Sequence, residues 1–228
     1  MDKIKELICF TKIFNKLEYA ESFLEGNIRF TPLKNYVLIE DGRKDFREGL
    51  ILNLQPQKTE FKVKMKEKIK IVKNIKEPIA ISLGEVLNRK CFCLSINRWF
   101  NFFKEKNSEE IKFEFQGVTE EEIKKFGEYI VVINNELFLK RILKYFEDNR
   151  ISPKKGKVKY EDLSKFHGEI EEVGFVKDIK YRSENEYRIL VDMSEEGVQT
   201  INIGSLKDIA MIVNYEEFKS IFITKNEN

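Results

Sequence analysis

The chain has 228 residues, of which 42% are hydrophobic, 35% charged and 12% aromatic, and 41 Lys and Arg residues nearly balance 39 Asp and Glu residues. This composition excludes a disordered chain, because the apolar residues suffice for a core. It also argues against a protein that binds nucleic acid through a large overall positive charge. No stretch approaches the roughly 18 apolar residues of a membrane span, and the charged first residues do not resemble a signal peptide. We therefore expect a cytoplasmic protein with no membrane partner.

The cysteine and histidine residues limit the metal chemistry. The three cysteines, Cys9, Cys91 and Cys93, are an odd number, and we expect them to be reduced and buried. The chain has a single histidine, His167, and the neighbouring cysteines are separated by one residue, not by the two of a zinc knuckle. The sequence therefore predicts no metal.

Strand and helix patterns alternate in the N-terminal part. Residues 7–14 are a short apolar run typical of a strand, residues 19–24 carry apolar side chains at helical spacing, and Gly26 stands where a helix ends in a left-handed residue. Residues 28–30 predict a second strand. The polar segment 36–49 is expected to be a loop or a broken helix.

Lysine occupies every even position of the segment 61–71, and the odd positions are apolar except for Glu67. This period of two predicts a long strand or hairpin arm, in an excursion from the domain at about residues 56–80. We expect one face of it to carry Lys62, Lys64, Lys66, Lys68 and Lys70. Such a face suits a macromolecular partner, a protein more than a nucleic acid because no aromatic residues share it. The alternative is an exposed face that charge protects against aggregation.

The rest of the chain is dense in strand patterns. Residues 89–96 predict a strand with Cys91, Cys93 and Ser95 on one face and Phe92, Leu94 and Ile96 on the other. Helices are expected from residue 119 and over residues 137–146 and 216–221, and strands over residues 129–133, 173–181, 185–192, 198–203 and 209–213. We expect one domain over residues 1–228, with an α+β fold and a largely antiparallel sheet.

Two carboxylates stand two residues apart at the start of one C-terminal strand. The period of two places Glu184, Glu186 and Arg188 on one face. If this face lines a cleft, one carboxylate can bind a ribose hydroxyl and stabilise a cationic transition state while the other activates an acceptor. If the face is solvated, the same residues form an ion pair of little consequence.

The segment 36–49 contains acidic residues interleaved with basic ones, and the acidic residues are Glu40, Asp41, Asp45 and Glu48. Carboxylates of this kind can bind a divalent cation. The interleaved cations oppose metal binding and the spacing matches no calcium loop, so we expect a self-neutralising loop that covers a cleft. A metal-dependent nuclease that uses Asp41, Asp45 and Glu48 ranks last among the possible functions.

The order of several short motifs resembles that of a widespread bacterial and phage family of unknown function. The resemblance is carried by Tyr19-Ala20-x-x-Phe23-Leu24-x-Gly26-x-Ile28-x-Phe30-x-Pro32-Leu33, Glu40-Asp41-x-x-x-Asp45-x-x-Glu48-Gly49, Cys91-x-Cys93-Leu94-Ser95 and Lys177-x-x-x-Tyr181-x-x-Glu184-x-Glu186-x-Arg188. That family in turn resembles the ADP-ribosyltransferase fold, whose enzymes use NAD. The resemblance implies a split, largely antiparallel sheet with flanking helices.

The resemblance also implies roles for single residues. Glu186, or Glu184 beside it, matches the glutamate that holds the nicotinamide ribose and stabilises the oxocarbenium ion, and Ser95 matches the serine that orients it. The positions that would contact NAD are Thr11 or Lys12 in the first strand, Arg29, and Tyr36, which would stack on the nicotinamide. The chain departs from the pattern because its first strand has no Arg or His and Ser95 is followed by Ile96-Asn97 in place of Thr-Ser.

Two functions are open on these residues. One is an NAD-dependent ADP-ribosyltransferase or NAD glycohydrolase, which would suit a toxin, a phage-defence effector or a phage counter-defence factor. The other is a catalytically inactive module of the same fold that blocks a macromolecular partner, as a phage inhibitor of the anti-CRISPR kind does. A concave pocket lined by the two glutamates, Ser95 and an aromatic residue favours the first. A flat, solvated face favours the second.

Overall fold

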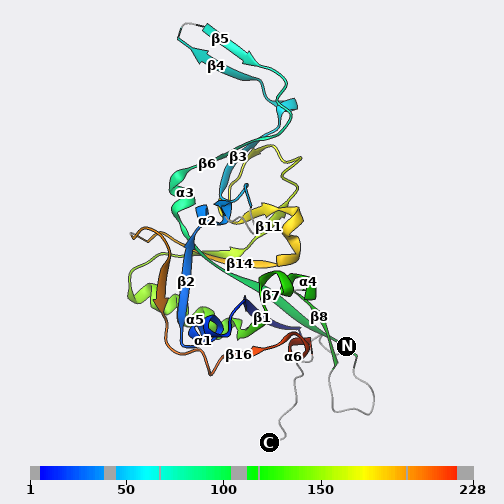
Figure 1. The fold of residues 1–228 in the computed structure, drawn as a ribbon, viewed down its shortest axis with the longest axis vertical. Helices are drawn as coiled ribbons and strands as arrows, with labels where there is room; N and C mark the ends of the chain where they lie inside the picture. The colour runs from blue at the N-terminus through cyan, green and yellow to red at the C-terminus, as the bar shows by residue number, and fades with distance from the viewer. Residues whose placement is uncertain are drawn as a thin grey trace, which may run out of the picture.

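The structure is a computed structural model, and it describes residues 6–38, 45–66, 68–103, 112–117, 119–193 and 195–219. Figure 1 shows a body built around one long twisted sheet, with a narrow hairpin extending from one end. No helix within these ranges is long and apolar enough to cross a membrane.

The large sheet has nine strands, and all of its pairings are antiparallel. Its main path runs β10-β14-β7-β1-β9-β16, with β2 and β8 also paired to β7 and β15 paired to β2. The strands are β1 (Glu6–Phe14), β2 (Asn27–Pro32), β7 (Lys90–Phe103), β8 (Lys112–Gln116), β9 (Tyr129–Asn134), β10 (Lys154–Lys157), β14 (Glu186–Val191), β15 (Gln199–Asn202) and β16 (Ala210–Val213). The expected α+β class with a largely antiparallel sheet is confirmed.

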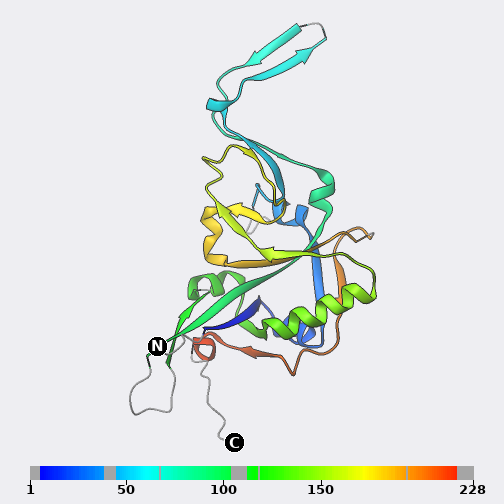
Figure 2. The same ribbon diagram turned by 180° about the vertical axis from the view of Figure 1, so that it is seen from behind.

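One face of this sheet holds the main hydrophobic core. Helices α1 (Leu17–Leu24) and α5 (Asn135–Asp148) cover it, and Figure 2 shows α5 lying across the strands. Helix α5 begins after Asn134, whose side chain accepts a hydrogen bond from the backbone N–H of Leu137 (3.1 Å) and satisfies one free donor of the first turn. The buried residues of β7 on this face are Phe92, Leu94 and Ile96. The faces predicted for this strand are therefore confirmed.

Smaller elements cover the other face near one end of the sheet. A three-stranded sheet joins β3 (Leu50–Leu54), β6 (Ile79–Ser82) and β12 (Gly168–Glu169), and β11 (Lys159–Glu161) pairs in parallel with β13 (Val176–Asp178). The remaining helices are α2 (Leu33–Leu38), η1 (Pro56–Lys58), α3 (Gly84–Asn88), α4 (Glu120–Phe126), η2 (Ile179–Glu184) and α6 (Tyr215–Lys219).

Two expected elements differ from the structure. The strand expected over residues 173–181 is only β13, because Asp178 caps the 3₁₀ helix η2 by accepting a hydrogen bond from Lys180 N. Glu184 therefore ends a helix, and Asn185, in a left-handed conformation, separates it from β14. The segment 36–49 begins inside α2, and its residues 39–44, which include Glu40 and Asp41, lie outside the described residues.

The hairpin of β4 (Phe61–Met65) and β5 (Lys68–Val72) projects from the body (Figures 1 and 2). Its register pairs Lys62 with Ile71, Lys64 with Ile69, Val63 with Lys70 and Met65 with Lys68. Directly opposed residues share a face, so each face of the hairpin mixes lysine with apolar residues. The expectation of a single lysine face is wrong. The expected hairpin arm itself is present.

The end of α1 offers a test of the fold. Gly26 has φ +91°, and a Cβ there would lie 2.1 Å from the backbone oxygen of Gly204. We predict that Gly26→Ala lowers the free energy of unfolding by about 2–3 kcal/mol, because both the backbone conformation and the close approach resist a side chain. Urea unfolding measures this loss. The control is Gly84→Ala, where no heavy atom beyond the neighbouring residues and the backbone of the same helix lies within 4 Å of the new Cβ. Equal midpoints for the two variants would contradict the prediction.

Candidate functional site

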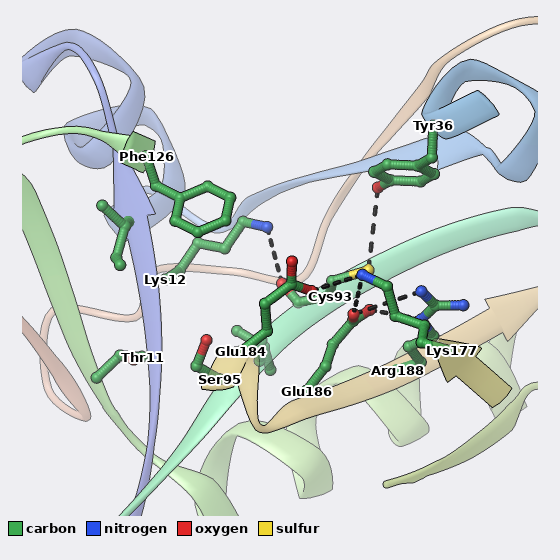
Figure 3. A pocket seen from close by; sticks show the side chains of 12 residues that line it. Thr11, Lys12, Tyr36, Cys93, Ser95, Phe126, Lys177, Glu184, Glu186 and Arg188 are labelled. Atoms are coloured by element: carbon green, nitrogen blue, oxygen red, sulfur yellow. Dashed lines mark hydrogen bonds and ion pairs between the residues drawn. The ribbon is translucent and has the colours of Figure 1, made fainter. Parts of the chain in front are cut away.

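A cleft opens where strands β1 and β7 separate. The pairing of β1 with β7 ends at Thr11 and Ser95. Beyond this point β1 remains paired with β9 as far as Phe14 and forms one side of the opening. The other side is β7, which is paired with β14. The sheet thus divides between its two central strands. A cavity of about 210 Å³ occupies the opening, and Figure 3 shows side chains from both sides pointing into it.

Three of the candidate residues lie in one row across the sheet. Thr11 is opposite Ser95 in β1 and β7, and Ser95 is opposite Glu186 in β14. Opposed residues of neighbouring antiparallel strands share a face, so their side chains reach the same side of the sheet. Glu184 extends over the cavity from the end of η2 (Figure 3).

Most of the residues predicted from the sequence meet at this cavity. Its lining includes Thr11, Lys12, Tyr36, Ser95, Glu184 and Glu186. Arg29 does not reach it and instead lines an adjoining cavity of about 330 Å³, which shares Lys12, Tyr36 and Cys93 with the first. The five lysines of the hairpin line neither cavity.

A chain of alternating charges forms one wall of the cleft. The guanidinium of Arg188 donates to Glu186 through Nε (2.5 Å) and to both carboxylate oxygens of Glu48 (2.5 and 2.8 Å). The ammonium of Lys177 then bridges Glu186 (3.1 Å) and Glu184 (2.5 Å). These two cations hold three carboxylates, and a third cation, the Lys12 ammonium, lines the same cavity.

Glu184 and Glu186 differ in burial, and their pKa values shift in opposite directions. The side chain of Glu186 is only 7% exposed and that of Glu184 is 23% exposed. Burial alone would raise the pKa of Glu186, but Arg188 and Lys177 outweigh it and hold that pKa well below its ordinary value. For Glu184, burial prevails and raises the pKa above its ordinary 4.5; Lys177 opposes this rise and Glu186 adds to it. Glu186 is a fixed carboxylate, whereas Glu184 titrates and faces the cavity.

Aromatic and thiol groups complete the lining of the cleft beside these charges. Tyr36 is half-buried, and its hydroxyl lies 3.9 Å from Cys93 Sγ. Burial raises the pKa of the Tyr36 hydroxyl well above its ordinary value, so it stays protonated. Phe126 also lines the cavity (Figure 3), and no sequence pattern had singled it out.

Two cysteines of β7 form a small group with Glu186 of the charged wall. The Sγ atoms of Cys91 and Cys93 and a carboxylate oxygen of Glu186 lie within 4.8 Å of one another. Burial raises the pKa of Cys91 well above its ordinary value, so this thiol resists the deprotonation that metal binding requires. Glu186 is already bound by Arg188 and Lys177, two cations that repel a metal ion. The group does not fit a metal site.

The acidic segment plays a structural part that the sequence did not indicate. Glu48 is 1% exposed and pairs with Arg188, 140 residues further along the chain. Asp45 is 3% exposed, and burial, with Glu48 nearby, raises its pKa. The expectation that the loop neutralises its own charges is wrong for Glu48, because the partner of Glu48 is the distant Arg188. A carboxylate bound to Arg188 is also poorly placed to serve a metal-dependent nuclease.

Comparison with family models, with curated proteins and with solved structures finds no match to this chain.

The buried ion pairs predict how stability depends on pH. Glu186→Gln leaves Arg188 and Lys177 short of a charge partner, and we expect it to lower the free energy of unfolding by about 3 kcal/mol at pH 7. The folded-state pKa of Glu186 is depressed, so its contribution is complete above the ordinary value of 4.5 and is lost as the pH falls below it. The difference between wild type and variant should therefore shrink on acidification.

Urea unfolding at pH 7 and pH 4 measures this difference. The control is Glu169→Gln, which changes an exposed carboxylate in β12 and should stay within about 0.5 kcal/mol of wild type. A Glu186→Gln loss that is small, or that stays constant between the two pH values, would show that the ion pairs do not stabilise the fold.

Proposed function

We propose that the cleft binds NAD and cleaves the bond between its nicotinamide and its ribose, so that ADP-ribose passes to an acceptor or to water. The observation that carries the proposal is the alignment of Thr11, Ser95 and Glu186 across three strands where the sheet opens, with Glu184 over the cavity. A concave site with two carboxylates, a hydroxyl and aromatic walls suits a nucleotide better than the flat surface of a binding module does. The resemblance to the ADP-ribosyltransferase fold supports the same proposal.

The carboxylates of the wall suit this reaction. As the glycosidic bond breaks, its electrons leave with nicotinamide and the ribose becomes an oxocarbenium cation. The positive charge of NAD lies first on the nicotinamide ring and moves to the ribose as the bond breaks, so a fixed negative charge beside the ribose favours the transition state. Glu184 and Glu186 bring two carboxylates to the cavity, and the cations that hold Glu186 keep it ionised without reorganisation. Electrostatic stabilisation is the largest catalytic effect that this geometry offers.

The proposal divides the work between the two glutamates. Glu186 cannot turn toward a ligand without breaking its contacts with Arg188 and Lys177, so it provides the fixed field and positions Lys177. Glu184 is more exposed and comes from a helix end, so it contacts the ribose hydroxyls or activates the acceptor. Ser95, half-buried between them and Thr11, orients the ribose.

The adjoining cavity suits an elongated ligand. It continues past Lys12, Tyr36 and Cys93, and Arg29 lines it. A dinucleotide has two such halves joined by an anionic pyrophosphate, and Lys12 lies on the border between the two cavities. The Lys12 ammonium donates to the carbonyl of Cys93 (2.8 Å), a neutral acceptor that leaves its positive charge uncompensated at this contact. Tyr36 offers a ring at the same border for the nicotinamide.

An activity of this kind suits a toxin, a phage-defence effector or a counter-defence factor. The alternative, an inactive module that blocks a macromolecular partner, draws support from the exposed hairpin and from the missing Arg or His in the first strand. Turnover of NAD separates the two functions.

The first test follows nicotinamide release from NAD. We expect wild-type protein to release nicotinamide, and Glu184→Gln to slow this release about 100-fold, because a charge that stabilises the transition state is lost while the shape of the side chain is kept. Isothermal calorimetry should show NAD binding by both proteins with dissociation constants within about threefold of each other. Glu169→Gln is again the control and should release nicotinamide at the wild-type rate.

Two results would overturn the proposal. The absence of both heat and nicotinamide release at millimolar NAD would exclude NAD as the ligand. Binding without release, by wild type as well as by the variant, would favour the inactive module.

The second test is the pH profile of the same reaction. Because burial raises the pKa of Glu184 and catalysis needs its ionised form, we expect the rate to fall on the acid side with a midpoint above 4.5. The slope should disappear in Glu184→Gln, whose residual rate has no carboxylate to titrate at this position. A midpoint that is unchanged in the variant would assign the titration to another group.

A further inference from the structure

The projecting hairpin is a two-stranded sheet with both faces exposed. Its apolar side chains keep large exposed fractions: 47% for Val63, 54% for Met65, 65% for Ile69, 50% for Ile71 and 41% for Val72. In the described part of the chain, β4 and β5 pair only with each other, so the outer edge of each strand offers unpaired backbone groups. An isolated hairpin of this size is marginally stable in water. Charged residues alone would prevent this edge from pairing with another chain. The exposed isoleucines are not needed for such protection against aggregation.

The register determines which side chains a third strand would meet. On β5, Ile69 and Ile71 point to one face, and Lys68 and Lys70 point to the other. A strand added along this edge would therefore place alternate side chains beside isoleucine and beside lysine. Its matching sequence alternates apolar and acidic residues. The outer edge of β4 has the same alternation, with Val63 and Met65 on one face and Lys62 and Lys64 on the other.

The ion pairs of the hairpin favour the edge of β5. In β4, Lys62 is already paired with Glu60 (2.6 Å), so Lys64 is the only lysine of that strand without an ion pair to a described residue, against two such lysines in β5. Neither Lys68 nor Lys70 forms an ion pair with any residue of the described ranges. Carboxylates opposite these two lysines would gain cross-strand attraction, and apolar residues opposite the isoleucines would remove exposed apolar surface from water.

The geometry points to the hairpin as a docking arm that receives an extended acidic segment of a partner protein, added as a third strand along β5. Main-chain hydrogen bonds at the open edge supply affinity, and the alternation of lysine and isoleucine selects a segment of alternating acidic and apolar residues. The inference is independent of the NAD reaction, since the hairpin contributes no side chain to either cavity.

Competing occupants fit the hairpin less well. A nucleic acid would gain phosphate contacts from the lysines but would leave the exposed isoleucines beside charged groups. A second copy of this chain, paired through β5 with Ile69 opposite Ile69, would place Lys68 opposite Lys70 and so oppose like charges.

The test uses a dye-labelled peptide of four Glu-Val repeats and measures its binding to the full chain by fluorescence anisotropy. We expect saturable binding that weakens as salt is raised. Lys68→Glu combined with Lys70→Glu should weaken it by about tenfold or more, because both new contacts are repulsive. The matched control is Lys154→Glu combined with Lys155→Glu, the same change at two exposed lysines of β10, which should leave binding unchanged. Circular dichroism checks that both double variants fold.

A second peptide separates strand addition from charge attraction. N-methylation at alternate residues removes the hydrogen-bond donors of one edge and keeps every charge. We expect this peptide to lose binding. Equal binding of the methylated and unmethylated peptides, or equal loss in the two double variants, would overturn the inference. Preferential binding of a duplex DNA of the same charge, or self-association through the hairpin in sedimentation, would overturn it in favour of those occupants.

Discussion

The buried contact of Arg188 with Glu186 and Glu48 supports the rest of the site. The side chain of Arg188 is 2% exposed, and its guanidinium also donates to the backbone oxygen of Gly174 (2.7 Å). It thereby joins β14, the turn that precedes β3 and the segment before β13, which are far apart in the sequence. A charge in this position is stable only while its partners remain, because an unpaired buried ion costs several kcal/mol. The same contact that holds these segments together also keeps a carboxylate ionised beside the cleft.

The two faces of β7 explain why the site lies where it does. One face is occupied by Phe92, Leu94 and Ile96 against the helices, and substitution there would cost packing. The other face is not needed for the main core, so Cys93 and Ser95 can meet a ligand. Where β1 leaves β7 and continues along β9, the edge of β7 has lost its pairing with β1 and the cleft opens. The core and the site therefore use alternate residues of a single strand, and each can vary with little effect on the other.

The sequence is informative wherever local periodicity determines the outcome. The period of two assigns both faces of residues 91–96, and Gly26 occupies a left-handed position at the end of α1 as expected. Distant pairing is a different matter, since nothing local to Glu48 indicates that its partner is Arg188. The strand pattern also could not predict the position of Glu184. The side chain of Asp178 caps a 3₁₀ helix, and Glu184 lies at the end of this helix and not in β14. The faces on which the hairpin lysines lie depend on the length of the loop between the strands. Two residues separate Met65 from Lys68, so odd positions of one strand face even positions of the other, and the lysines are divided between the two faces.

The central claim is that the opening between β1 and β7 is the binding site for NAD, and hydrogen–deuterium exchange with and without NAD tests it most directly. If NAD binds there, exchange slows on adding NAD in residues 12–14 of β1, in residues 91–96 of β7 and in residues 184–188, and the hairpin strands β4 and β5 do not change. Unchanged exchange at the cleft with millimolar NAD, or protection confined to another surface, would contradict it.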